Sequence, residues 1–148
     1  ERGLRPGTEN VVGIAGLGAA CRVAARDLEA EGAPLAALRD TLERSLRAHV
    51  PGLAVNGEGA PRLPNTSSVR FPGVLGRALL EATPGLAASA GSACHEGAET
   101  ASRVIRAMGV PEAEALGTVR LSLGRGTSDR DVAAAAALLL AAYARLRR

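Results

Sequence analysis

The amino-acid sequence predicts an α+β fold, in which helices pack on a small antiparallel sheet. Long segments repeat apolar residues at helical spacing, whereas short segments between glycines and prolines alternate apolar and polar residues, as half-buried strands do. The chain has 148 residues, of which 47% are hydrophobic, and this is enough for one ordinary core. It holds one phenylalanine and one tyrosine, so aliphatic side chains must build that core. This composition favours closely packed helices over a sandwich of bulky strands.

Two helices are expected in the first third of the chain. Residues 8–31 carry apolar side chains at helical spacing, which form one stripe. Its members are Ile14, Leu17, Gly18, Cys21, Ala24, Ala25 and Leu28. Because Cys21 lies within the stripe, we expect it to be a small buried side chain. The second helix should begin with Pro34 in its first turn and end near Pro51. His49, in its last turn, interacts favourably with the helix dipole and is given no catalytic role.

Shorter elements follow in the second half. The segments "LAVNG" and "TSSVRFPG" are predicted strands, and "LGRALLEA" is a predicted short helix. A strand of small residues is expected in "LAASAGSAC", a helix in "ASRVIRAMG" and a further strand in "TVRLSLG". Ser128 and Asp131 form a capping-box pattern in front of a long final helix.

Composition and charge argue against several classes of function. The net charge of +3 suggests nucleic-acid binding, but the arginines are scattered along the chain and stacking aromatic residues are lacking. The longest apolar run, residues 132–144, is too short to span a bilayer, so no membrane role is expected. Two cysteines make no disulfide framework and no signal peptide opens the chain, so we expect the cytoplasm. No metal site is predicted. The missing initiator methionine leads us to expect a piece of a longer or processed product.

Cys94 is the candidate reactive residue. In "LAASAGSACHEG" a stretch of alanine, serine and glycine gives way to polar residues, and small neighbours leave a thiol accessible. The adjacent His95 can stabilise a thiolate when it is protonated. A loop cysteine taken alone is more often inert than catalytic, so other segments must decide its role.

Four segments in order supply that context: "RGLRPGTEN", "LPNTSSVRFPGV", "SAGSACHEG" and "VRLSLGRGT". Together they resemble the C-terminal part of a cysteine desulfurase, in the pyridoxal-phosphate family that also holds selenocysteine lyases and class V aminotransferases. The resemblance covers essentially the whole chain. It implies the small C-terminal domain of a fold-type I enzyme, with residues 1–12 ending the large cofactor domain and residues 13–148 forming the small domain with the catalytic cysteine loop.

The resemblance also implies a role for three residues. Cys94 matches the nucleophile that takes sulfur from L-cysteine as a persulfide, releases alanine and delivers the sulfur to an acceptor or scaffold protein. Arg120 matches the arginine that binds the substrate carboxylate. Thr8 matches a threonine that reaches the phosphate of pyridoxal 5'-phosphate in the opposite subunit of a homodimer. Iron-sulfur cluster assembly, RNA thiolation and DNA sulfur modification are the pathways such an enzyme serves.

The chain contains no lysine, because all 18 basic residues are arginine. The lysine that holds the cofactor in this family belongs to the upstream half, so we expect the chain to work with a lysine-bearing N-terminal portion and to be inactive alone. The alternatives are a non-catalytic persulfide carrier or partner-docking module derived from the family and, ranked last, a basic nucleic-acid-associated protein.

Overall fold

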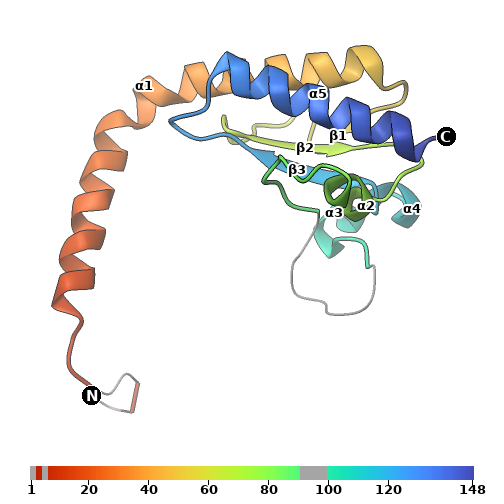
Figure 1. Ribbon diagram of the computed structural model, residues 1–148. Coiled ribbons are helices and arrows are strands. Elements are labelled where there is room, and N and C mark those ends of the chain that lie inside the picture. The colour runs from red at the N-terminus through yellow and green to blue at the C-terminus, as the bar shows by residue number, and fades with distance from the viewer. Residues whose placement is uncertain (1–2, 5–6, 91–99) are drawn as a thin grey trace.

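The computed structural model describes residues 3–4, 7–90 and 100–148. Three strands form one antiparallel sheet in the order β1-β2-β3: β1 (Ala54–Val55), β2 (Thr66–Arg70) and β3 (Thr118–Ser122). The helices are α1 (Val11–His49), α2 (Gly76–Glu81), α3 (Arg103–Ala107), α4 (Glu112–Ala115) and α5 (Asp129–Leu146). The second half of α1 and all of α5 cover one face of the sheet, and the short helices lie toward its other side (Figure 1). The predicted α+β architecture is confirmed.

The core lies between the sheet and the two long helices. Val69 of β2 pairs with Val55 on one side and Val119 on the other, so three buried valines line up across the sheet. Leu46 of α1 and Leu139 of α5 are fully buried above them. Aliphatic side chains therefore build most of the core, as the composition predicts.

The two aromatic residues join the end of β2 to α5. The rings of Phe71 and Tyr143 lie 5.7 Å apart, and the Tyr143 hydroxyl donates a hydrogen bond of 3.0 Å to the Pro72 carbonyl. The polar tip of the tyrosine is thus satisfied where its ring packs on the core.

The expectation of two separate helices before residue 51 is wrong. α1 is one helix of 39 residues with Pro34 inside it. A proline in a helix interior removes one backbone hydrogen bond and bends the helix without always ending it. Figure 1 shows this bend, beyond which the first half of α1 extends away from the body of the molecule.

The expectation that Cys21 is buried is also wrong. Cys21 is exposed, as are the large apolar members of its stripe. The stripe exists as the sequence predicts, but no described element of this chain covers it.

The remaining elements follow the sequence closely, with two differences. β1, β2, β3, α2, α3 and α5 fall within the segments predicted for them, and the capping box of α5 is present. The short helix α4 was not predicted. The expected strand in "LAASAGSAC" is reduced, up to Ala90, to a single bridge between Ser89 and Arg120, and residues 91–99 lie outside the described residues.

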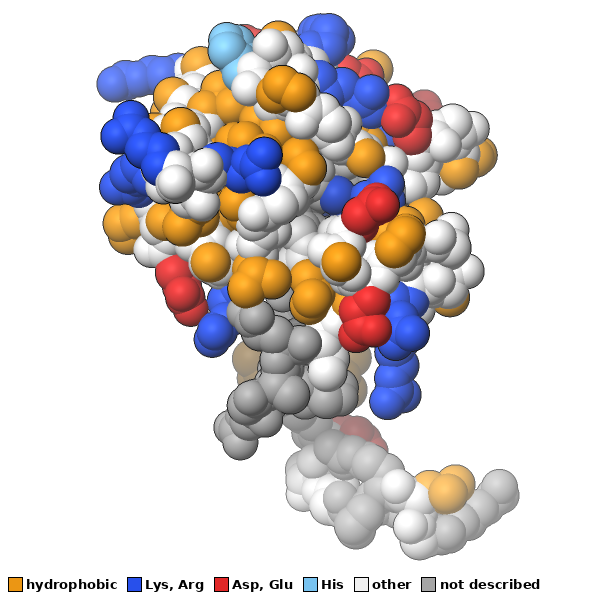
Figure 2. Space-filling view, turned by 90° about the vertical axis from the view of Figure 1, so that its right-hand side faces the viewer, with side chains coloured by type: hydrophobic (Ala, Val, Ile, Leu, Met, Phe, Trp, Pro, Cys, Tyr) orange, Lys and Arg blue, Asp and Glu red, His pale blue; other side chains and the backbone are white. Residues whose placement is uncertain are grey.

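Two surface properties bear on function. Within the described residues, no helix combines the length and the apolar character needed to cross a membrane. On the face shown in Figure 2, basic side chains lie in separate groups among apolar, acidic and uncharged ones. That distribution differs from the continuous basic stripe that usually tracks a nucleic-acid backbone.

Candidate active-site face

Arg120 lies in the middle of β3 and points away from the core. Val119 and Leu121 are buried, and the alternation of a strand places Arg120 between them on the opposite face, where it is exposed. Its backbone is held from both sides, by the ladder to Ser68 of β2 and by the bridge to Ser89. No described residue forms a hydrogen bond or an ion pair with its guanidinium, so a cationic fork is available on a rigid strand.

Ser89 connects this strand to the segment that contains Cys94. The Arg120 N–H donates to the Ser89 carbonyl at 2.7 Å, and the Ser89 N–H donates to the Arg120 carbonyl at 3.1 Å. Cys94 and its neighbour His95 lie outside the described residues. The chain therefore enters its cysteine segment beside Arg120.

A row of polar side chains accompanies Arg120 on the same face of the sheet. Ser68 is its cross-strand neighbour, and the Ser68 hydroxyl accepts a hydrogen bond of 2.9 Å from the Asn56 amide. Arg70 donates from Nη1 to the Asn56 side-chain oxygen at 2.6 Å. The sequence interpretation missed Ser68, Asn56 and Arg70. The alternation of "TSSVR" would have placed Ser68 and Arg70 on the face away from Val69.

The end of β3 is also rigid. The Leu123 N–H donates to the Asn65 carbonyl at 2.8 Å, and the Asn65 amide donates to the Leu123 carbonyl at 3.1 Å. A turn follows in which Thr127 Oγ1 accepts from the Gly124 N–H at 2.9 Å. Arg120 is thus held on a strand that is fixed along its length, which is what a substrate-positioning residue requires.

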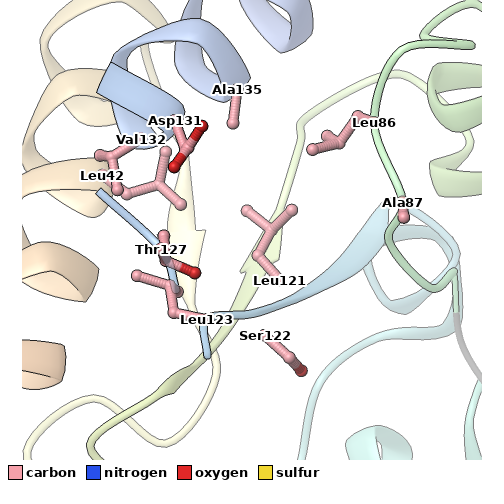
Figure 3. A pocket seen from close by; sticks show the side chains of 10 residues that line it. All are labelled: Leu42, Leu86, Ala87, Leu121, Ser122, Leu123, Thr127, Asp131, Val132 and Ala135. Carbon is pink, nitrogen blue, oxygen red and sulfur yellow. The ribbon is translucent and has the colours of Figure 1, made fainter. Parts of the chain in front are cut away.

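A small apolar hollow of about 160 Å³ lies on the core side of β3 (Figure 3). Its walls come from α1, α5, β3 and the residues that precede Ser89. They are Leu42, Leu86, Ala87, Leu121, Ser122, Leu123, Thr127, Asp131, Val132 and Ala135. Of its three polar side chains, Thr127 and Asp131 already serve the turn and the cap of α5, and Ser122 points away from the other lining side chains (Figure 3). The hollow therefore offers packing space but no free catalytic group.

Thr8 lies far from this face. It precedes α1, whose first turn is capped by Asn10 Oδ1 accepting from the Gly13 N–H at 2.9 Å. Figure 1 places the start of α1 at the far end of its projecting half, well away from β3. One copy of the chain therefore does not bring Thr8 and Arg120 into a single site.

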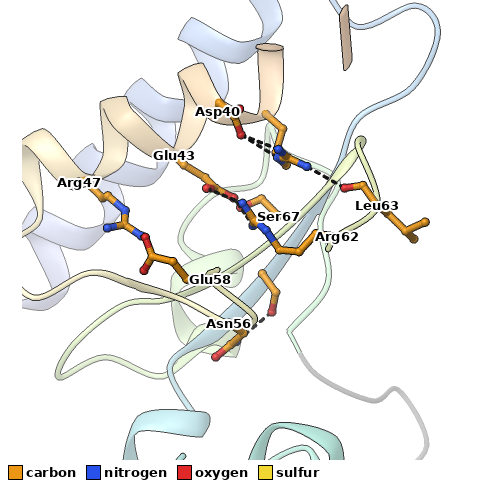
Figure 4. Close-up of polar contacts among 10 residues, drawn as sticks. Asp40, Glu43, Arg47, Asn56, Glu58, Arg62, Leu63 and Ser67 are labelled. Carbon is orange, nitrogen blue, oxygen red and sulfur yellow. Dashed lines mark hydrogen bonds and ion pairs between the residues drawn. The ribbon is translucent and has the colours of Figure 1, made fainter. Parts of the chain in front are cut away.

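A partly buried polar cluster fixes α1 on the sheet (Figure 4). Glu43 of α1 is 8% exposed and accepts hydrogen bonds from Arg62 Nη1 at 2.8 Å, from Arg62 Nη2 at 3.2 Å and from Ser67 Oγ at 2.7 Å. Burial raises the pKa of Glu43, but the hydrogen bonds from Arg62 and Ser67 outweigh burial and hold its pKa below the usual value. The cluster joins α1, β2 and the loop between β1 and β2, so it supports the sheet that carries Arg120.

The family model described as aminotransferase class-V matches residues 1–134. The chain is 46% identical over 134 residues to a cysteine desulfurase of Gluconacetobacter diazotrophicus and, over the same length, 46% identical to the cysteine desulfurase NifS of Azotobacter vinelandii. Each match covers 89% of this chain, and covers 34% and 33% of those relatives.

Two solved structures of NifS-like proteins share the fold of this chain. A NifS-like protein from Rickettsia africae superposes with a TM-score of 0.78 at 27% identity, over 97% of this chain and 36% of that one. A second NifS-like protein superposes with a TM-score of 0.72 at 31% identity, over 99% of this chain and 36% of that one.

The chain belongs to the class-V aminotransferase family. Its curated relatives in that family are named cysteine desulfurases, which confirms the resemblance carried by the four sequence segments. The chain spans about a third of the length of the curated relatives it matches. Its sheet and helices thus correspond to one part of those longer relatives.

Proposed function

We propose that the chain is the C-terminal portion of a cysteine desulfurase that moves sulfur from L-cysteine to Cys94. The bond between Cβ and sulfur of the substrate breaks, the sulfur joins the Cys94 sulfur as a persulfide, and alanine leaves, so that cysteine and enzyme thiol become alanine and enzyme persulfide. The pairing of Ser89 with Arg120 supports this proposal, because it places the residues just before the cysteine segment beside an exposed arginine. The names of the curated relatives support it.

Arg120 is proposed to bind the substrate carboxylate. A planar guanidinium donates two parallel hydrogen bonds to a carboxylate, and a backbone held on both sides keeps this fork in one orientation. With the carboxylate fixed there, the substrate would be held in one position while its sulfur reacts. Cys94, as a thiolate, would then attack that sulfur.

The family's cofactor is pyridoxal 5'-phosphate, which supplies an electron sink when bound. The donors of this chain fit that group in part. The Thr8 hydroxyl, three residues before a long helix, suits a phosphate oxygen, but a sequence without lysine cannot hold the ring covalently. We therefore assign the lysine to an upstream portion of the enzyme. Because Thr8 precedes α1, whose start lies well away from the strand β3 that carries Arg120 (Figure 1), we assign Thr8 to the site of the opposite subunit in a homodimer.

The last step of the proposed activity is delivery of the persulfide sulfur to an acceptor protein. A persulfide on Cys94, which polar residues follow in the sequence, can be handed to a second protein, and an iron-sulfur scaffold protein is the acceptor to test first. We place the activity in the cytoplasm, where free thiols stay reduced.

The test uses the complete enzyme with radiolabelled cysteine. Cys94→Ser should abolish labelled persulfide and leave cofactor binding unchanged. Cys21→Ser is the matched control, because Cys21 is the second cysteine of the chain and its replacement should leave persulfide formation unchanged. Mass mapping of the alkylated persulfide identifies the labelled peptide, and label on Cys21 would refute the assignment.

The absence of lysine favours one alternative, a persulfide carrier or partner-docking module that uses Cys94 alone. Such a module would accept sulfur from a small persulfide donor and pass it on, and adding an upstream portion would give no desulfuration. Regained desulfuration on addition of the upstream portion excludes this alternative.

A further inference from the structure

A row of polar residues crosses the sheet on the face that carries Arg120. Asn56 follows β1, Ser68 lies in β2 and Arg120 lies in β3. The Asn56 N–H donates to the Ser68 carbonyl at 2.8 Å, and Ser68 is the cross-strand neighbour of Arg120. Residues that lie opposite one another in neighbouring strands direct their side chains to the same face. The row therefore places an amide, a hydroxyl and a guanidinium next to one another.

Ser68 and Arg120 form a closely spaced pair. The Arg120 N–H and C=O both bond to Ser89, on the other side of β3, so neither of them bonds to Ser68. In an antiparallel sheet, opposed residues without mutual backbone hydrogen bonds have Cα atoms only about 4.5 Å apart, and their side chains are correspondingly close. Ser68 is half-buried and Arg120 is exposed, so one ligand can reach both side chains.

Arg70 determines which atom of the Asn56 amide faces Ser68. A guanidinium only donates hydrogen bonds, so the Asn56 atom that Arg70 Nη1 contacts at 2.6 Å is the oxygen. The Asn56 nitrogen then faces Ser68 and donates to its hydroxyl oxygen at 2.9 Å (Figure 4). Because this bond uses the Ser68 oxygen as an acceptor, the hydroxyl hydrogen is left for a partner on the side of β3. Ser68 Oγ donates to no described residue.

The stabilising contacts of Arg70 do not by themselves explain its position. Its side chain is 18% exposed, and its ion pair with Glu114 has an Nε to Oε2 distance of 3.7 Å. The Nε atom is buried and forms no hydrogen bond with a described residue. A buried donor without a partner lowers stability. Among the described residues, the short hydrogen bond of the Arg70 guanidinium is the one to Asn56, which sets the direction of the Ser68 hydroxyl.

We infer that the Ser68 hydroxyl is a further donor to the substrate carboxylate that Arg120 binds, and that Arg70 and Asn56 are positioning residues that direct it. The inference rests on the proposed function, in which Arg120 binds the carboxylate of L-cysteine. A carboxylate has about four acceptor positions, so it can accept two bonds from the Arg120 fork and one from Ser68. A ligand without a carboxylate gains nothing from Ser68.

The test measures substrate binding apart from turnover. In the complete enzyme with Cys94→Ser, calorimetry gives the dissociation constants of L-cysteine and of cysteamine, which is cysteine without its carboxylate. Ser68→Ala should weaken the binding of L-cysteine about tenfold and leave that of cysteamine unchanged. Ser68→Thr keeps the hydroxyl and should restore most of the affinity. Ser122→Ala is the matched control, because it removes a hydroxyl from the same face of β3 but opposite Thr66. It should change neither constant.

Asn56→Asp separates the direction of the hydroxyl from the stability of the fold. The introduced carboxylate accepts from both Arg70 and Ser68, so the Ser68 hydrogen turns away from the ligand while the contact with Arg70 becomes an ion pair. Urea unfolding should show no loss of stability, although L-cysteine binding weakens as it does in Ser68→Ala. In the double variant the affinity should fall no further, because both changes remove the same hydrogen bond. Losses that add fully would assign the effect to charge repulsion and overturn the positioning role.

The outcomes distinguish this inference from the proposed function. If Arg120→Ala weakens L-cysteine binding and Ser68→Ala does not, the inference is wrong and the proposed function stands. A Ser68→Ala loss confined to L-cysteine, in an enzyme that retains Cys94 and forms no persulfide on it, supports the inference and contradicts the proposed sulfur transfer alone. Equal losses for L-cysteine and cysteamine would show that Ser68 acts on the fold and not on the carboxylate, and would also overturn the inference.

Discussion

At the scale of single residues, Arg120 is the one to test first. Arg120→Ala should lower kcat/KM for cysteine in the complete enzyme by an amount equivalent to about 2 to 4 kcal/mol, the cost of losing a two-pronged contact with a carboxylate in a partly desolvated site. Arg120→Lys should restore part of the loss, since an ammonium lacks the planar fork. Arg106→Ala, which breaks an exposed ion pair with Glu112, is the control and should change little. An unchanged kcat/KM in Arg120→Ala would remove this residue from the site.

Glu43 gives a prediction about stability against pH. Because its pKa is lowered in the folded protein, its carboxylate contributes stability that is present above its ordinary pKa of 4.5 and is lost as the pH falls through the folded value. Glu43→Gln should therefore lower stability at pH 7 by about 2 to 4 kcal/mol and flatten the acid limb of the stability curve. Urea unfolding across pH 3 to 7 measures both effects. If Glu58→Gln, which alters the exposed pair with Arg47, has the same effect, the cluster has no special role.

At the scale of elements, the cap of α5 is a local feature whose contribution to the free energy of unfolding can be measured. Ser128 Oγ accepts from the Asp131 N–H at 3.3 Å, and Asp131 Oδ2 accepts from the Ser128 N–H at 2.9 Å. Ser128→Ala should lower the free energy of unfolding by about 1 kcal/mol. Ser102, at the start of α3, makes no capping hydrogen bond, so Ser102→Ala should be neutral. Thermal melts of the two variants compare them directly, and equal losses would contradict the cap.

The elements also show where sequence reasoning succeeds and where it stops. Alternation in "TVRLSLG" and the cap before α5 are local patterns, so they predict β3, the exposure of Arg120 and the start of α5. Pro34 lies within a continuous helix because the residues on both sides of it favour helix. A rule that considers only the proline and its neighbours does not show whether these residues outweigh the lost hydrogen bond. The burial of Glu43 depends on Arg62, a residue 19 positions away, and on Ser67, so it cannot be found within one helix. The apolar stripe around Cys21 predicts a buried face, but a stripe does not tell which chain buries it.

At the scale of the whole molecule, the missing lysine determines what the isolated chain can do. A class-V aminotransferase relative needs a deprotonated lysine to hold its cofactor, and this chain offers no side-chain amine. After incubation with pyridoxal 5'-phosphate the isolated chain should be colourless, borohydride reduction should attach no cofactor to a side chain, and cysteine should yield neither sulfide nor alanine. Joined to an upstream portion, it should gain colour and desulfuration together. The control is the joined protein with Cys94→Ser, which should gain colour alone, because the proposed attack by the thiol follows cofactor binding. If the purified chain, free of any upstream fragment by mass spectrometry, desulfurates cysteine, then its chemistry does not depend on a second portion and the proposed division of the enzyme is wrong.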